Sequence, residues 1–309
     1  MSDLCLPRAL RVLVVGLALV IAPTGAQAQE MEPRTYSNSP VGFNFVIAGY
    51  AFSSGGLSAD PSFPVDDASL RIHSGIFAYA RALDLWGKSG KVDVVVPYSR
   101  LSGNGTVEGQ PVERQVSGFG DPRLRLSVNL YGAPALSMKE FAGYKRDLVI
   151  GASAQVSIPC GQYDSSKVIN LGTNRWSIRA DVGFSKALGS LTLDVTTSAT
   201  YYTENDDFFR GNTLQVAPIY AAQANLSYDF GDTLWAGLGA TYYGGGRMTL
   251  NGDASDVELG NARIGAVVVV AISRRQSIKL GLSRGVYTRS GTNFSVLGIA
   301  WQIRWGAGL

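Results

Sequence analysis

LTLDVTTSATYY, the stretch from Leu191 to Tyr202, places Leu, Leu, Val, Thr, Ala and Tyr at its odd positions and Thr, Asp, Thr, Ser, Thr and Tyr at its even ones. Successive side chains of a β-strand point to opposite faces, so this period of two predicts a strand with one apolar face. The same split recurs at 124–130 and 297–305.

Twelve such stretches follow one another along the chain, at 42–52, 70–83, 91–100, 123–130, 148–158, 176–186, 191–202, 214–229, 233–243, 262–273, 277–287 and 297–305. A tilted strand that crosses a membrane needs about 9–11 residues, whereas strands of soluble proteins average about 5–6. The lengths therefore predict an all-β fold, a closed antiparallel transmembrane β-barrel of about 12 strands over 41–305. The last strand must pair with the first, because the bilayer core offers no water to an open edge.

The connections alternate in length. Tight turns occur at 188–190, 231–232 and 274–276, whereas the segments 101–120, 159–175, 203–213 and 244–261 are long and rich in Gly, Asp, Asn and Ser. Short periplasmic turns and long extracellular loops are typical of outer-membrane barrels. The segment 132–147 departs from this pattern, because it is long although its place is periplasmic.

The N-terminus carries an export signal. Arg8 and Arg11 precede an apolar stretch at 12–22, and the small-x-small run at 26–28 predicts cleavage before Gln29. A signal peptide over 1–28 would be followed by a short periplasmic segment at 29–40, with a C-terminal tail at 306–309. Cys5 would leave with the signal, so Cys160 would remain alone and form no intrachain disulfide. Export to the bacterial outer membrane is expected.

Composition supports this architecture. The chain contains 37 Gly and 14 Tyr, only 17% of its residues are charged, and its net charge of +3 is spread without a Lys/Arg-rich run, so nucleic-acid binding is not expected. Aromatic residues gather at the ends of the predicted strands, as in the girdles of outer-membrane barrels. They are Tyr98, Tyr131, Trp176, Tyr201, Tyr202, Tyr228, Phe230, Tyr242, Tyr243, Trp301 and Trp305.

The polar faces of the strands, if they point inward, supply the lumen of the barrel. They carry Arg71, His73, Arg81, Asp93, Arg123, Arg125, Arg179, Asp181, Asp194, Asp229, Arg263, Lys279 and Arg304. Twelve strands enclose a narrow lumen. Either the Arg and Asp side chains pair and hold it shut, or they form a positively biased path for a small anionic or aromatic solute, with Arg123, Arg125 and Arg179 as its contacts.

The means of closure stays open at this point. The segment 29–40 is long enough for a small stopper and too short for a hatch domain. Inward side chains together with a loop such as 101–120 could close the lumen instead, or the channel could be open and narrow.

Catalytic and metal sites are not predicted. His73 is the single histidine, and no Ser-centred motif accompanies it as an outer-membrane phospholipase would require. The carboxylates Asp206, Asp207, Asp253, Asp256 and Glu258 lie in predicted loops, where they could at most bind calcium weakly. The glycine run 244–246 precedes no helix, so it is not a phosphate-binding loop. No cofactor is expected.

Four motifs follow one another along the chain in the order found in a known family: SGFGD at 117–121, PCGQYD at 159–164, NLGTNRWSIR at 170–179 and YYTENDD at 201–207. They resemble the outer-membrane transporter family of the meta-pathway of phenol degradation. The resemblance implies a barrel related to the transporters of long-chain fatty acids and aromatic hydrocarbons. Cys160 departs from the family pattern, in which a small polar residue such as Thr is expected at this position.

Three hypotheses follow. The first is an outer-membrane channel for small hydrophobic or aromatic compounds, with lipid, the barrel-assembly machinery and the solute as its partners. The second is a structural or surface-binding barrel that acts through loops such as the one carrying Phe208, Phe209 and Arg210. The third is a secreted soluble β-protein, for which twelve apolar outer faces would impair solubility.

Overall fold

A computed structural model describes residues 32–58, 65–107 and 109–308. The predicted signal peptide at 1–28 lies outside the described residues. Within the described residues, no helix is long and apolar enough to cross a membrane.

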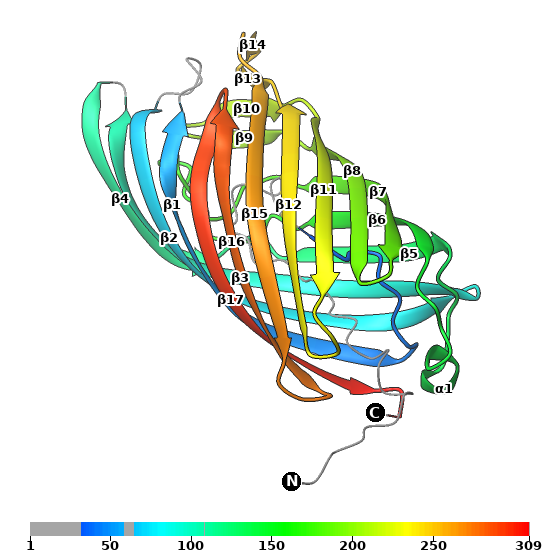
Figure 1. Ribbon diagram of the computed structural model, residues 1–309. Coiled ribbons are helices and arrows are strands. Elements are labelled where there is room, and N and C mark those ends of the chain that lie inside the picture. The colour runs from blue at the N-terminus through cyan, green and yellow to red at the C-terminus, as the bar shows by residue number, and fades with distance from the viewer. Residues whose placement is uncertain (1–31, 59–64, 108, 309) are drawn as a thin grey trace, which may run out of the picture.

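Twelve long antiparallel strands form the wall of the molecule (Figure 1). In chain order they are β1 (Phe43–Ser58), β2 (Val65–Leu85), β3 (Lys88–Val107), β5 (Arg123–Tyr131), β6 (Leu148–Ser157), β7 (Ser177–Leu188), β8 (Leu191–Tyr202), β11 (Ile219–Asp229), β12 (Leu234–Gly245), β15 (Leu259–Ala271), β16 (Gln276–Thr288) and β17 (Gly291–Gly306). Each pairs with the next, and β1 pairs with both β2 and β17. The predicted closed 12-stranded barrel is confirmed.

The seam between the first and last strands is continuous. β1 and β17 pair from Phe43 opposite Gly306 to Ser58 opposite Gly291 without a break in register. Every backbone group of the two terminal strands along this seam can therefore find a partner, which is the condition for a barrel to cross a bilayer.

Alternation sets the two faces of the wall. In β5, Arg123 and Arg125 are buried, whereas Leu124 and Leu126 between them are 45% and 49% exposed. The same pattern exposes Leu238, Leu297 and Ile299 on other strands. The outer surface is therefore apolar, as the period of two predicted, while the inner face carries a mixture of charged, polar and apolar residues.

The two ends of the barrel differ. At one end, β9 (Asn205–Phe208), β10 (Asn212–Val216), β13 (Met248–Leu250) and β14 (Asp253–Ala254) form a small sheet, while α1 (Met138–Phe141) and the C-terminal end of β17 lie at the other (Figure 1). The segment 101–120, predicted as a loop, instead continues β3 into a hairpin with β4 (Gln110–Phe119). Its glycines suggested a loop, but Gly109 provides the hairpin turn with a φ of 75° and the flanking residues pair.

Candidate functional site: the barrel lumen

One side of the lumen is charged. Arg125, Ser153 and Asp181 project inward from β5, β6 and β7 and are all buried. Arg125 Nε donates to Ser153 Oγ at 3.2 Å, and Ser153 Oγ donates to Asp181 Oδ2 at 3.1 Å. Arg179 Nη2 lies 2.7 Å from Asp181 Oδ1. This row of linked side chains, with Arg123 and Asp194 beside it, is called the charged wall below.

The opposite side of the lumen is apolar, which the sequence analysis did not predict. Near the α1 end it carries Phe43, Phe45, Ile47, Ile76, Ala78, Ala80, Ala82, Val95 and Ala300. Toward the other end a second apolar cluster of Leu70, Ile72, Leu101 and Phe294 packs with Leu171 of the loop after β6, and the buried inward serines Ser53, Ser74 and Ser99 lie between the two clusters. These residues come from the inward faces of β1, β2, β3 and β17 and are called the apolar wall below. The signal was present in β2, whose even positions from Ala68 to Ala82 are apolar except for Ser74.

The N-terminal segment 32–40 lies inside the barrel between the two walls. Its residues are nearly all buried, and Glu32 pairs with Arg125 Nη1 at 2.5 Å. The predicted periplasmic segment 29–40 is therefore, over its described part, placed as a stopper in the lumen. Its charged residues explain this, because Glu32 and Arg34 find partners of opposite charge on the inner wall.

Arg34 is the most extensively held residue of this segment. Its Nη2 donates to Asp229 Oδ1 at 2.7 Å, its Nε donates to Ser227 Oγ at 3.0 Å, and its backbone N–H donates to Asp194 Oδ2 at 3.2 Å. The guanidinium carbon also lies 4.4 Å from the centre of the Trp235 ring, within the range of a cation–π contact. Only 1% of Arg34 is exposed.

Tyr36 occupies a recess that only glycine leaves open. Its ring packs with Ala133 and Val149 and is 2% exposed. A Cβ at Gly151 of β6 would lie 2.2 Å from Tyr36 Cδ1, far inside van der Waals contact. Gly151 therefore allows the ring to lie flat on the inner face of β6.

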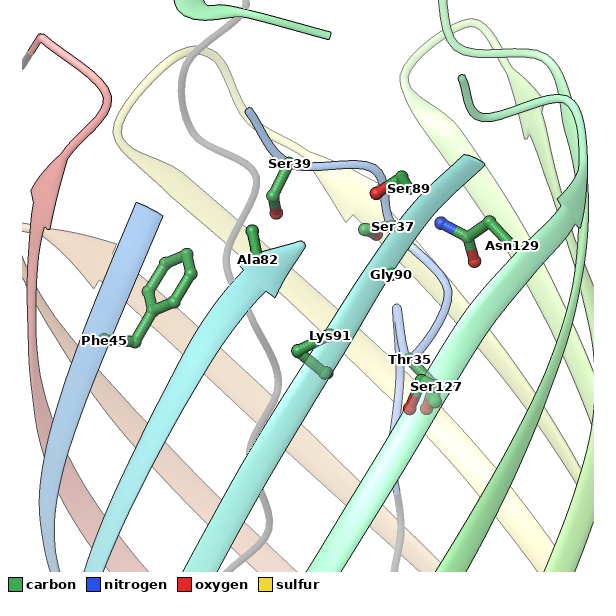
Figure 2. Close-up of a pocket in the computed structure, with 10 residues that line it drawn as sticks. All are labelled: Thr35, Ser37, Ser39, Phe45, Ala82, Ser89, Gly90, Lys91, Ser127 and Asn129. Atoms are coloured by element: carbon green, nitrogen blue, oxygen red, sulfur yellow. The ribbon is translucent and has the colours of Figure 1, made fainter. Parts of the chain in front are cut away.

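Polar residues of the segment complete the filling of the lumen. Thr35, Ser37 and Ser39 face the inner surfaces of β1 to β3 and β5, where Phe45, Ala82, Lys91, Ser127 and Asn129 surround them (Figure 2). The cavity left between the segment and the wall measures about 20 Å³, which is about the room that one water molecule needs. This cavity has no room for a solute larger than a water molecule while the segment is in place.

The charge on Glu32 is strongly favoured. Burial raises the pKa of this carboxyl, but the Arg125 and Arg179 cations and a hydrogen bond from Arg125 outweigh it and lower the pKa to about 2. Glu32 is therefore an anion at neutral pH, and its contact with Arg125 is a full ion pair.

The long connection 132–147 holds the segment where it leaves the lumen. Asn38 Nδ2 donates to the Pro134 carbonyl at 3.1 Å, and the Val41 N–H donates to the Leu136 carbonyl at 2.9 Å. Ser89 and Ala135 tie the same connection to the β2–β3 turn. Its unusual length for a turn at this end is therefore explained by its contacts with the N-terminal segment.

At the opposite end, the loop 158–176 folds against the inside of the barrel. Asp121, 2% exposed, accepts hydrogen bonds from the Gly161 N–H at 3.0 Å and from the Thr173 N–H and Oγ1 at 2.8 and 2.7 Å. The loop thereby places Leu171 on the apolar wall. The loop 158–176 therefore narrows the lumen at the end opposite to α1, whereas 101–120 belongs to the β3–β4 hairpin.

The predicted lumen residues divide into two groups. Arg123, Arg125, Arg179, Asp181, Asp194 and Arg304 are buried on the inner face, and Lys279 lies half-buried on the inner face of β16. Arg71 and His73, and also Arg81, are exposed on the outer face of β2, so their placement in the lumen was wrong. The reason is that the apolar side chains of β2 face the lumen as part of the apolar wall. The polar side chains that alternate with them therefore lie on the outer face.

Two of the predicted girdle residues also point inward. Tyr243 is 1% exposed and its hydroxyl lies 3.3 Å from Asn261 Nδ2. Tyr202 lies beneath the Arg175 guanidinium, 4.5 Å from ring centre to carbon. Tyr98, Trp176, Tyr201, Tyr220 and Tyr242 are exposed on the outer surface.

The candidate catalytic and metal groups do not assemble into a site. His73 Nδ1 lies 2.7 Å from the Tyr50 hydroxyl on the outer surface. No three His, Cys, Asp or Glu side chains of the described residues are arranged to hold a metal ion.

A closed antiparallel barrel of twelve strands, apolar outside and occupied by its own N-terminal segment and an inward loop, is the fold of an outer-membrane β-barrel protein. The chain belongs to the family described as "Putative MetA-pathway of phenol degradation", whose model matches residues 52–301. The resemblance seen in the sequence motifs is thus confirmed.

Solved structures show the same fold. An outer membrane channel from Pseudomonas putida F1 matches with a TM-score of 0.77 and 21% identity over 89% of this chain and 100% of that one. The β domain of the Bordetella autotransporter BrkA matches with a TM-score of 0.52 and 8% identity, over 86% and 99% of the two chains. The transport unit of the autotransporter AIDA-I from Escherichia coli matches with a TM-score of 0.50 and 10% identity, over 85% and 90%. No curated protein matches the sequence of this chain.

Proposed function

We propose that this protein is an uptake channel for small hydrophobic or aromatic compounds and that the solute moves along the apolar wall. The observation that carries the proposal is the pair of inward apolar clusters on this side of the lumen, one with Phe294, Leu70 and Ile72 at the loop end and one with Ile76, Phe45 and Phe43 near α1, with only small serine side chains between them. A water-filled porin has a polar interior. An apolar strip along one side of the lumen offers a hydrophobic solute contacts that a sugar or an ion does not use.

The charged wall has a second role in this proposal. Arg125 and Arg179 hold Glu32, and Asp194 and Asp229 hold Arg34, so these residues keep the segment 32–40 in the lumen. Passage of a solute requires this segment to move aside. Once it does, Arg123, Arg125 and Arg179 face the solute and favour an aromatic that carries a negative charge.

The surface-binding alternative is weakened by the burial of its aromatic residues. Phe208 and Phe209, the aromatic residues cited for it, are each 6% exposed and pack with Leu214 beneath the small sheet of β9, β10, β13 and β14. They stabilise the loops of the channel and do not present an apolar surface to a partner.

Proteoliposomes test the transport proposal. Benzoate and shikimate are both carboxylated six-membered rings of similar size, but only benzoate is aromatic and apolar. In a variant whose segment is released, Glu32→Gln with Arg34→Gln, we expect benzoate to enter faster than shikimate and faster than into empty liposomes. Equal rates for the two acids would contradict an apolar path, and a rate equal to that of empty liposomes would contradict transport itself.

A further inference from the structure

The outer face of β2 carries basic residues at two heights. Its exposed side chains run from Arg81 through Phe77 to His73 and Arg71. Arg81 and Arg71 are ten residues apart, which at about 3.4 Å per residue and a tilt of about 40° corresponds to about 26 Å along the membrane normal. The apolar band of an outer-membrane barrel is about 25 Å tall. An apolar band of this height fits between Arg81 and Arg71, with Arg71 on the side of the long loops.

Aromatic residues independently mark the edge of this band on the side of the long loops. Tyr98 on β3 and Tyr50 on β1 both pair with Gly75 of β2, so the two side chains flank this position on the outer face. Tyr98 stacks edge to face on Phe119 of β4, with ring centres 5.2 Å apart. All three rings are about half exposed on the outer surface. Such rings sit at the level of the lipid headgroups.

Just beyond these rings, toward the long loops, the outer surface becomes basic. His73 pairs with Arg100 of β3, and Arg71 pairs with Ser102, so Arg71 and Arg100 are diagonal neighbours, about 7–8 Å apart. Ser54, Ser102 and Ser117 provide hydroxyls around them on the same face. Within the described part of the chain, neither arginine forms a salt bridge. An outward carboxylate, Glu113, pairs with Asn104 one step farther from the apolar band.

We propose that Arg71, Arg100 and His73 form a binding site for the phosphate group of a lipid in the outer leaflet. A guanidinium presents a planar pair of donors that matches phosphate oxygens. The Tyr50 hydroxyl, 2.7 Å from His73 Nδ1, can donate to that nitrogen, and the ring then carries its proton on Nε2 and offers a third donor. The height of the site, next to the aromatic rings and beyond the apolar band, identifies the phosphate as that of a membrane lipid.

Lipid retention by the purified, detergent-solubilised channel tests this site. The probe is lipid A, used with both phosphates and after their enzymatic removal, and bound lipid is measured by native mass spectrometry. The variant is Arg71→Gln with Arg100→Gln. Arg81→Gln is the matched control, because it lies on the same face of the same strand at the other edge of the band. Heat-modifiable migration verifies that each barrel is folded.

The wild-type channel and the Arg81→Gln variant should retain phosphorylated lipid A equally, and both should retain the dephosphorylated lipid less. The double variant should bind the phosphorylated lipid about tenfold more weakly or worse, because both guanidinium groups that donate charge-assisted hydrogen bonds to the phosphate are lost. Equal retention by the double variant and the wild type would overturn the proposal. Displacement of the lipid by millimolar inorganic phosphate would also overturn it, since the site would then recognise a free anion.

Discussion

The Glu32 carboxylate pairs with the Arg125 guanidinium inside the barrel, and each side chain is 8% exposed. Glu32 belongs to the N-terminal segment and Arg125 to β5 of the barrel wall. This ion pair therefore joins the segment that moves in the proposed transport to the fixed barrel. Removal of one partner from a buried pair leaves the other charge uncompensated, at a cost of about 3–5 kcal/mol.

Glu32→Gln should therefore release the N-terminal segment and open the lumen. We expect the single-channel conductance or the solute flux to rise by about tenfold or more, because the ion pair between the segment and the wall is replaced by a weaker contact with a neutral amide. The control is Glu204→Gln, which changes an exposed loop carboxylate that contacts Gln215. An unchanged flux in Glu32→Gln, with a folded barrel, would show that this ion pair does not keep the lumen closed.

Mild acid should leave this closure intact. The pKa of Glu32 is lowered from its ordinary value of 4.5 to about 2 in the docked segment. A depressed pKa gives docking energy that is present above the ordinary value and is lost only as the pH falls toward the depressed one. Flux through the wild-type channel should thus not rise between about pH 8 and about pH 5 through titration of Glu32. A rise in wild-type flux that Glu32→Gln abolishes would contradict this assignment.

Gly151→Ala should displace the ring of Tyr36. A Cβ at this position would lie 2.2 Å from Tyr36 Cδ1 and 2.6 Å from its Cγ, so the ring must leave its recess. We expect the flux to rise as it does in Tyr36→Ala. The double variant should show no more than the larger single effect, because both changes remove the same contact. Additive effects would mean that Gly151 acts on something other than the tyrosine ring.

The sequence predicted the barrel well because alternation is a property of each strand alone. Leu124 and Leu126 against Arg123 and Arg125 identify the two faces of β5 without any knowledge of its neighbours. Alternation does not say which face is inside, and β2 shows the consequence. Leu70 and Ile72 are buried there and Arg71 and His73 are exposed, because the inner surface has an apolar wall and the outer surface extends beyond the bilayer.

The contents of the lumen could not be predicted in the same way. The segment 32–40 has no periodicity, and its position depends on partners such as Asp229 that lie far away in the sequence. Arg34 is joined to Asp229 over 195 residues. The available signal was the pair of charged residues Glu32 and Arg34 ahead of the first strand, because these side chains can form ion pairs with residues of opposite charge on the inner wall.

The carboxylate of Asp121 joins two parts of the loop 158–176. Asp121 accepts three hydrogen bonds from Gly161 and Thr173, and in Asp121→Asn one acceptor oxygen becomes a donor that faces N–H groups. We expect the loop to loosen by about 1–3 kcal/mol. Cys160, which is exposed and adjacent to Gly161, can carry a nitroxide label whose spectrum reports this motion. A spectrum as immobile as that of the wild type would show that the loop is held by other contacts.

The apolar wall can be tested by a change of polarity at constant position. Ile76 is 5% exposed within the wall, and Ile76→Gln places an amide there, whereas Ile76→Val keeps the surface apolar with a smaller side chain. In the Glu32→Gln background, so that the segment does not limit passage, we expect Ile76→Gln to reduce benzoate flux several-fold and to leave shikimate flux unchanged or raised. Ile76→Val should preserve the preference for benzoate. The reason is that a hydrophobic solute loses favourable contact area at an amide, about 25 cal/mol for each Å², while a hydroxylated solute gains a hydrogen-bond partner. A parallel loss of both fluxes would indicate a blocked lumen, and no loss of benzoate flux would place the solute path away from the apolar wall.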